Sequence, residues 1–201
     1  MEKLQVILLS VLAACTYGIV HDQITVRLCI EYFAIAHPPL FHTTSPTLLG
    51  LCWGVAATAG IGATLGVILA LVSQSPGTAS YPLSRLGRSI LLLLAVMATG
   101  AFAAGVVGYE LSGHGFISLP TRLADVIPAH QHDRFMAVWF AHGASYLVGL
   151  TGGALLCFRI WRARGRPSVI SFFARTPASA LRAGLLAAVA GYILWIRFGG
   201  H

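Results

Sequence analysis

Long apolar segments separated by short polar ones are the dominant pattern of this 201-residue chain. A membrane-spanning helix needs roughly 20 mostly apolar residues, and five stretches reach or approach that length. They cover residues 4–20, 47–72, 90–111, 135–158 and 177–196. Ser45-Pro46 and Thr176-Pro177 are each typical of an N-cap followed by the first helical residue. The pattern predicts an all-α fold, a polytopic membrane helix bundle of about five transmembrane helices that forms a single transmembrane domain over residues 1–201.

The composition agrees with this pattern. Hydrophobic residues make up 57% of the chain and charged residues only 9%, whereas soluble domains are about a quarter charged. These proportions exclude an ordinary soluble globular protein and a disordered chain. We therefore expect a multi-pass protein of the cell membrane, typical of a bacterial inner membrane, with the lipid bilayer as its main partner.

The positions of Lys and Arg predict the orientation in the membrane. With the N-terminus inside, nine of the 13 basic residues lie on the inner face and four on the outer face. The inner ones are Lys3, Arg85, Arg88, Arg159, Arg162, Arg164, Arg166, Arg175 and Arg182, and the outer ones are Arg27, Arg122, Arg134 and Arg197. We expect the N-terminus inside and the C-terminus outside. This topology, with contacts to anionic lipid headgroups, accounts for the net charge of +7, so no nucleic-acid partner is predicted.

The other polar residues gather on the side opposite to most of the basic ones. All eight His and five of the six acidic residues lie at or near the predicted outer face, around two outer loops of residues 21–45 and 113–134. Ion pairs such as Arg27 with Glu31, or the ordinary preference of polar residues for loops, are alternative explanations. Inner loops are equally wet, however, and contain no His. The clustering therefore indicates a polar site at the outer, periplasmic face.

Histidines and carboxylates in such a cluster suit a transition metal. Neutral imidazole and carboxylate groups bind Zn, Fe and Cu, and ionisable residues within a membrane are functional candidates by default. The candidate ligands are His21, Glu31, Glu110, His114, His130, His132 and His142, and the candidate supporting residues are Asp22, Arg27, Asp133 and Tyr146. Asp22 and Asp133 would orient ligand imidazoles. His142 is deeply placed in its span, which also makes it the best candidate for an axial ligand of a haem.

Residues 21–36 fit two kinds of secondary structure. As a helix, the segment places Gln23, Arg27 and Glu31 on one stripe. As a strand, it places alternate apolar residues on one face. A lone strand at a membrane surface would leave its backbone hydrogen-bonding groups unpaired. We therefore favour an interfacial segment or a continuation of the first helix, ending before His37.

The chain has four cysteines, Cys15, Cys29, Cys52 and Cys157. Their spacing is not that of a zinc finger and they show no obvious pairing, so no structural disulfide is expected. Residues 12–15 resemble the cleavage site of a bacterial lipoprotein signal, in which Cys15 would carry the lipid. We favour an uncleaved first span.

Glycines recur at the spacing that allows close approach of helices in membranes. The pairs are Gly50 with Gly54, Gly62 with Gly66, and Gly149 with Gly153. The spacing fits packing within the chain and packing between protomers equally well. A homo-oligomer and association with other membrane subunits therefore both stay open.

Four functions are compatible with these features. The first is a metal site at the outer face that acts on a small or lipid-soluble substrate. The second is a non-enzymatic subunit or assembly component of a membrane complex, with the outer loops as its docking surface. The third is a haem-binding redox subunit, and the fourth is a small transporter or channel, which would need an oligomer because five spans cannot form two equal repeats. The His and carboxylate cluster favours the first, although no sequence motif identifies a reaction.

Overall fold

The computed structural model describes residues 2–74 and 80–164 of the chain. Its elements are α1 (Glu2–Leu28), α2 (Glu31–Ala34), α3 (Pro46–Ser73), α4 (Leu83–Gly113), α5 (Thr121–Ala124), the 3-10 helix η1 (Ala129–Gln131) and α6 (His132–Ala163). The prediction of an all-α fold is confirmed for these ranges, and four helices are long and apolar enough to cross a membrane. The predicted fifth span, residues 177–196, lies outside the described residues.

Local sequence signals explain where these helices start and stop. The Ser45 hydroxyl accepts a hydrogen bond from the backbone N–H of Leu48, and Pro46 occupies the first turn of α3. Both features are favourable at a helix N-terminus. Beyond α4 the chain turns at Gly115, whose φ of 74° lies in the left-handed region that glycine adopts without steric cost.

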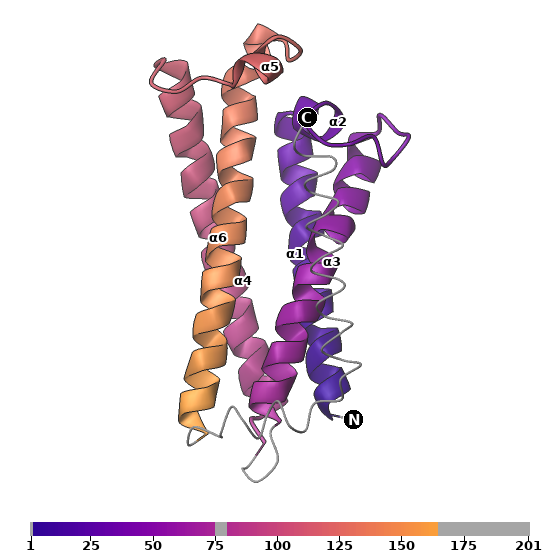
Figure 1. The fold of residues 1–201 in the computed structure, drawn as a ribbon, viewed down its shortest axis with the longest axis vertical. Coiled ribbons are helices and arrows are strands. Elements are labelled where there is room, and N and C mark those ends of the chain that lie inside the picture. Colours follow the sequence, from indigo (N-terminus) through magenta and orange to yellow (C-terminus); the bar gives the residue numbers. More distant parts are fainter. Residues whose placement is uncertain (1, 75–79, 165–201) are drawn as a thin grey trace.

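The four long helices form two antiparallel pairs (Figure 1). Helix α1 packs mainly against α3, and α4 packs mainly against α6. The short helices α2 and α5 lie at one end of the bundle, which we call the α2–α5 end, and the start of α1 lies at the other. The described His residues and five of the acidic residues lie toward the α2–α5 end, whereas Lys3 and most of the described Arg residues lie toward the opposite end. The predicted segregation of these two groups is therefore observed.

Helix α1 extends further than the first predicted span. It continues to Leu28, so residues 21–28 are helical and only residues 29–45 connect α1 to α3. The predicted outer loop over residues 21–45 is corrected in this respect, and of the two structures considered for this segment the helix is found. Helical hydrogen bonding satisfies the backbone within the segment itself. The side chain of Arg27 adds support because its guanidinium donates to the Gln23 side-chain oxygen, 2.6 Å away and one turn earlier.

Glycines on α3 bring α1 and α3 close together, which is packing within the chain, one of the two kinds that their spacing left open. A Cβ placed on Gly54 would lie 2.6 Å from the backbone N and Cα of Ile19 on α1. A Cβ on Gly66 would lie 2.9 Å from the Cβ of Ser10. Gly149 on α6 differs, because it faces the flexible end of the Met97 side chain rather than a backbone. Close backbone contact thus occurs within the α1–α3 pair, and also at Gly108 in the α4–α6 pair, where a Cβ would lie 2.7 Å from the carbonyl oxygen of Met136.

Two apolar clusters hold the pairs together near the two ends of the bundle. The cluster at the α2–α5 end includes Val26, Phe33, Leu49, Phe135 and Val138. The cluster at the opposite end includes Val6, Leu69, Leu86, Ile90 and Ile160. Between these clusters the two helix pairs are separated by a cavity, which adjoins the candidate site.

Candidate metal centre

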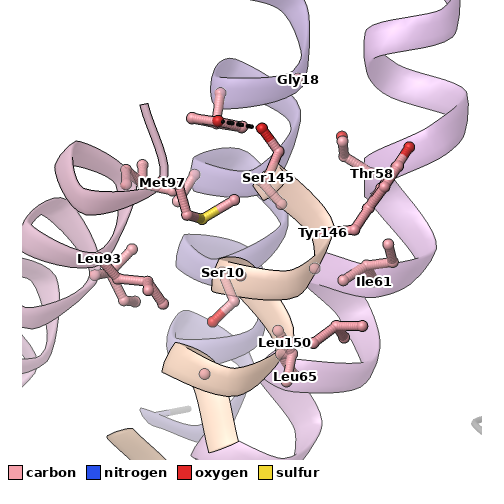
Figure 2. Close-up of a pocket in the computed structure, with 18 of the residues that line it drawn as sticks. Ser10, Gly18, Thr58, Ile61, Leu65, Leu93, Met97, Ser145, Tyr146 and Leu150 are labelled. Carbon is pink, nitrogen blue, oxygen red and sulfur yellow. Dashed lines mark hydrogen bonds between the residues drawn. The ribbon is translucent and has the colours of Figure 1, made fainter. Parts of the chain in front are cut away.

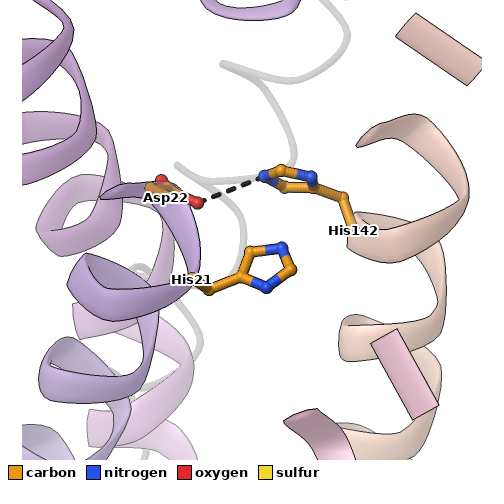
Figure 3. A group of neighbouring side chains, drawn as sticks. All are labelled: His21, Asp22 and His142. Carbon is orange, nitrogen blue, oxygen red and sulfur yellow. Dashed lines mark hydrogen bonds and ion pairs between the residues drawn. The ribbon is translucent and has the colours of Figure 1, made fainter. Parts of the chain in front are cut away.

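Three side chains, His21, Asp22 and His142, converge between the two helix pairs (Figure 3). One potential ligand atom from each lies within 4.8 Å of the other two. Helix α1 supplies His21 and Asp22, and α6 supplies His142. The side chains of neighbouring helical residues point about 100° apart. His21 and Asp22 can therefore both reach the space between the helix pairs when α6 lies opposite the direction midway between them. We call these three residues the His/Asp cluster.

The ring of His142 is fixed by two polar contacts. Its Nδ1 lies 2.9 Å from the carbonyl oxygen of Val138, which can only accept a hydrogen bond, so Nδ1 carries the proton. Its Nε2 lies 3.2 Å from Oδ1 of Asp22, and both side chains are buried. In the neutral ring, Nε2 then presents a lone pair to a carboxylate oxygen. These two acceptors need a proton or a cation between them.

His21 has an unsatisfied polar atom at the same place. Its ring contacts that of His142 edge-on, with centroids 4.5 Å apart, and stacks on Tyr17 at 5.6 Å. Its Nε2 is buried and has no hydrogen-bond partner. Leaving a buried polar atom unpaired costs roughly 1–3 kcal/mol. A bound ion or a ligand group would remove this cost.

Aromatic side chains cover the cluster on the α2–α5 side. The rings of Tyr32 and Phe33 lie 4.7 and 5.7 Å from that of His142. His37 is held beside them because its Nδ1 lies 2.6 Å from the carbonyl oxygen of Tyr32 and its ring packs on Trp53. Burial lowers the pKa of His37 and raises the pKa of Tyr32, so both are neutral at pH 7. The cover is therefore uncharged, and electrostatic interactions within the cluster are weakly screened.

Four other predicted ligands, Glu110, His114, His130 and His132, lie outside the His/Asp cluster. Glu110 and His114 are one turn apart at the exposed end of α4, with Oε2 and Nδ1 3.8 Å from each other. His130 is exposed in η1. The Nε2 of His132 lies 2.9 Å from the carbonyl oxygen of Ile127, so this ring fastens the turn before α6.

The predicted supporting residues are likewise dispersed. The guanidinium of Arg27 also donates to the hydroxyl of Thr47 and so links α1 to the start of α3. One carboxylate oxygen of Asp133 accepts a hydrogen bond of 2.7 Å from the Ser112 hydroxyl, which links α6 to α4. These contacts join the helices within each pair and stay away from the His/Asp cluster.

Asp22 lies in the His/Asp cluster, whereas Glu31 lies outside it. Asp22, expected as a supporting residue, contacts His142 and could also offer its own oxygen as a ligand atom. Glu31, expected as a ligand, accepts a hydrogen bond from the Cys29 thiol instead. The missed signal was the adjacent pair His21-Asp22 on a helix that continues past residue 20, because continuation turns both side chains toward α6.

A cavity of about 110 Å³ adjoins the cluster and runs between the helix pairs (Figure 2). All four long helices line it, mostly with small or aliphatic side chains. Tyr146 belongs to this lining, one turn beyond His142. The hydroxyl groups of Tyr17 on α1 and Ser145 on α6 are hydrogen-bonded across it at 2.7 Å. The cluster thus lies at one end of an apolar space rather than in a solvent-filled loop region.

Comparison of the chain with known proteins gave no match to a protein family, to a curated protein or to a solved structure. What can be said of function therefore follows from the His/Asp cluster, the cavity and the membrane-spanning character of the four long helices.

Proposed function

We propose that the protein holds a divalent transition metal ion, such as Zn²⁺ or Fe²⁺, in the His/Asp cluster and that this metal acts on a small or lipid-soluble substrate. The observation that carries the proposal is the approach of His142 Nε2 to Asp22 Oδ1 at 3.2 Å while Nδ1 of the same ring is committed to a carbonyl oxygen. Ligand histidines characteristically donate their second ring N–H to such an oxygen.

The donor set fits a metal that keeps room for a substrate. Two imidazoles and one carboxylate are the protein ligands of many catalytic zinc sites and of non-haem Fe²⁺ sites, and both types leave coordination positions open. Bonds to such metals are about 2.0–2.2 Å long, so two ligand atoms of one ion lie at most about 4 Å apart. The cluster atoms, within 4.8 Å of one another, need only a small inward rotation of their side chains.

A metal also accounts for more of the cluster than a proton does. A proton shared by Asp22 and His142 would make a buried ion pair, whose desolvation offsets much of its attraction. It would also leave Nε2 of His21 unpaired. A cation bound by all three side chains satisfies each of them and balances the buried carboxylate.

The contact between His21 and His142 argues against the haem alternative. Ring centroids 4.5 Å apart are at direct contact distance, so a flat macrocycle has no room between the two imidazoles. A metal without a porphyrin needs no such space.

The surroundings assign roles to the neighbouring residues. When bound, the metal would polarise an oxygen-bearing group of the substrate. His142 keeps its Nε2 lone pair directed at the site because Val138 holds its Nδ1–H. Tyr32 and Phe33 cover the site from the α2–α5 end and exclude water on that side.

Metal content of the purified protein tests the proposal. The protein is extracted in detergent, loaded with Zn²⁺ or Fe²⁺, freed of excess metal and measured by inductively coupled plasma mass spectrometry. We expect one ion per chain, lost in Asp22→Asn and His142→Gln. The matched controls Asp133→Asn and His114→Gln change the same residue types outside the cluster and should retain the ion. Wild-type protein without metal, or equal loss in the controls, would contradict the proposal.

A further inference from the structure

We infer that the cavity between the helix pairs binds the hydrocarbon chain of a single-chain lipid, with the lipid's oxygen-bearing head group at the His/Asp cluster. The inference rests on the proposed function and names its substrate class. The head group would be a carboxylate, hydroxyl or carbonyl group.

The walls of the cavity suit a hydrocarbon because most of their hydroxyl groups are already hydrogen-bonded within the protein. The hydroxyl groups of Ser10 and Thr58 each donate to the backbone carbonyl oxygen four residues earlier in their own helix. The hydroxyl groups of Tyr17 and Ser145 bond to each other. The remaining lining away from the cluster is aliphatic or glycine, apart from Met97 and Tyr146. A sugar or a nucleotide would find few hydrogen-bond partners there.

The shape of the cavity fits one linear chain. It extends from the level of Ser10 to that of His21 on α1, a distance of about 16 Å at the rise of a helix. A compact cavity of about 150 Å³ binds benzene, so this cavity accommodates only the part of the chain that is nearest to the head group. A volume of about 110 Å³ drawn out over this length is therefore narrow, and bulky or multi-ring ligands are excluded.

The histidine and aspartate side chains of the lining are confined to one end, which suits an amphiphile. The unpaired Nε2 of His21 and the facing pair of Asp22 and His142 lie at the end nearer to α2 and α5. Tyr146 and Leu150 line the cavity and are also 39% and 50% exposed. On a membrane-spanning bundle such side chains meet the acyl chains of the bilayer, so a lipid can enter sideways past them.

Two neighbouring residues of α3 provide a matched pair of variants. Ala57 lines the cavity, whereas Ala56 is exposed and does not. The substitution Ala57→Phe places a ring in the space for the chain, and Ala56→Phe places the same ring outside it. Neither residue belongs to the His/Asp cluster, so both variants keep the three proposed ligand side chains, and metal content measured in Ala56→Phe should equal that of the wild-type protein.

The experiment uses palmitic acid that carries a photoreactive diazirine in its chain. The probe is added to the detergent-purified protein and irradiated, and labelled residues are mapped by peptide mass spectrometry. We expect label on cavity residues such as Leu65, Leu69 and Leu93 in the wild-type protein and in Ala56→Phe. The overpacked Ala57→Phe should reduce this labelling about tenfold or more.

Several results would overturn the inference. They are label confined to lipid-facing positions such as Leu91 and Phe102, equal labelling in both Phe variants, or a disulfide between Leu65→Cys and a cysteine introduced in residues 177–196. The wild-type label map decides the question even where Ala57→Phe fails to fold. Metal bound without cavity label refutes only the lipid site, whereas cavity label without metal refutes only the proposed metal.

Discussion

Replacing Gly54 by alanine tests how tightly α1 packs against α3. A Cβ at this position lies 2.6 Å from the backbone N and Cα of Ile19, whereas ordinary contacts begin at 3.4 Å. Because both are backbone atoms, no side-chain rotation relieves the overlap. The two helices must separate locally by about 0.8 Å, the difference between these distances.

The size of the effect follows from this separation. A gap of about 0.5–1 Å reduces the dispersion energy of each atom pair across the interface by a quarter to a half. Overpacking of this kind lowers the free energy of unfolding by about 1–3 kcal/mol. Alanine returns up to about 1 kcal/mol because it favours the helix more than glycine does. The net loss of about 1–2 kcal/mol should lower the unfolding midpoint by about 2–8 °C for a chain of this length.

Gly60 on the same helix is the matched control. A Cβ there meets nothing within 4 Å, so Gly60→Ala gains helix propensity without overlap and should keep or raise the midpoint. Thermal unfolding in detergent, followed by tryptophan fluorescence, compares the two variants. A midpoint for Gly54→Ala equal to that of the wild type, or an equal fall for Gly60→Ala, would refute the close packing of α1 on α3.

Three further predictions concern the cluster, the link between the pairs and a cysteine. A chelator should lower the unfolding midpoint of the wild-type protein, and metal at 100 times its Kd should restore about 2.7 kcal/mol, whereas Asp22→Asn should respond to neither. Ser145→Ala removes the bond to Tyr17 and should cost about 1 kcal/mol in the same unfolding assay with unchanged metal content; a loss of metal would contradict this separation of roles. Burial raises the pKa of the Cys29 thiol to about 12, so the thiol stays protonated below that pH. In a variant that retains only this cysteine, alkylation by iodoacetamide should therefore keep rising beyond pH 9, where an ordinary thiol with a pKa of about 8.5 levels off.

The helices themselves could be predicted from the sequence because their causes are local. Runs of apolar residues and the Ser45-Pro46 cap determine helix formation within a few residues of each position. The depth of His142 within its apolar span likewise singled it out, since an ionisable residue there is costly. Each of these properties depends on one helix alone. The described residues contain the helices, the Ser45-Pro46 cap and a buried His142 as expected.

The composition of the cluster depended on which helices meet, and sequence spacing does not contain that information. Glu110 and His114 share one helical face and were plausible ligands, yet that face is exposed. His21 and His142 are far apart in the chain and meet only because α1 and α6 border the same cavity. The glycines of α3 lie directly against the backbone of α1, so these two helices form a pair. The neighbouring face of α1 then faces α6.

The position of the cluster links the metal to the cavity. The ligands come from both helix pairs, and the same two pairs form the cavity walls. Between the two apolar end clusters, the contacts that link the pairs include the bond between Tyr17 and Ser145 and the contacts of His142 with His21 and Asp22. If the proposed metal draws His142 toward Asp22, it would also narrow the adjoining space, and a lipid chain that fills this space would oppose that approach. By thermodynamic reciprocity, each ligand then changes the affinity for the other by the same factor.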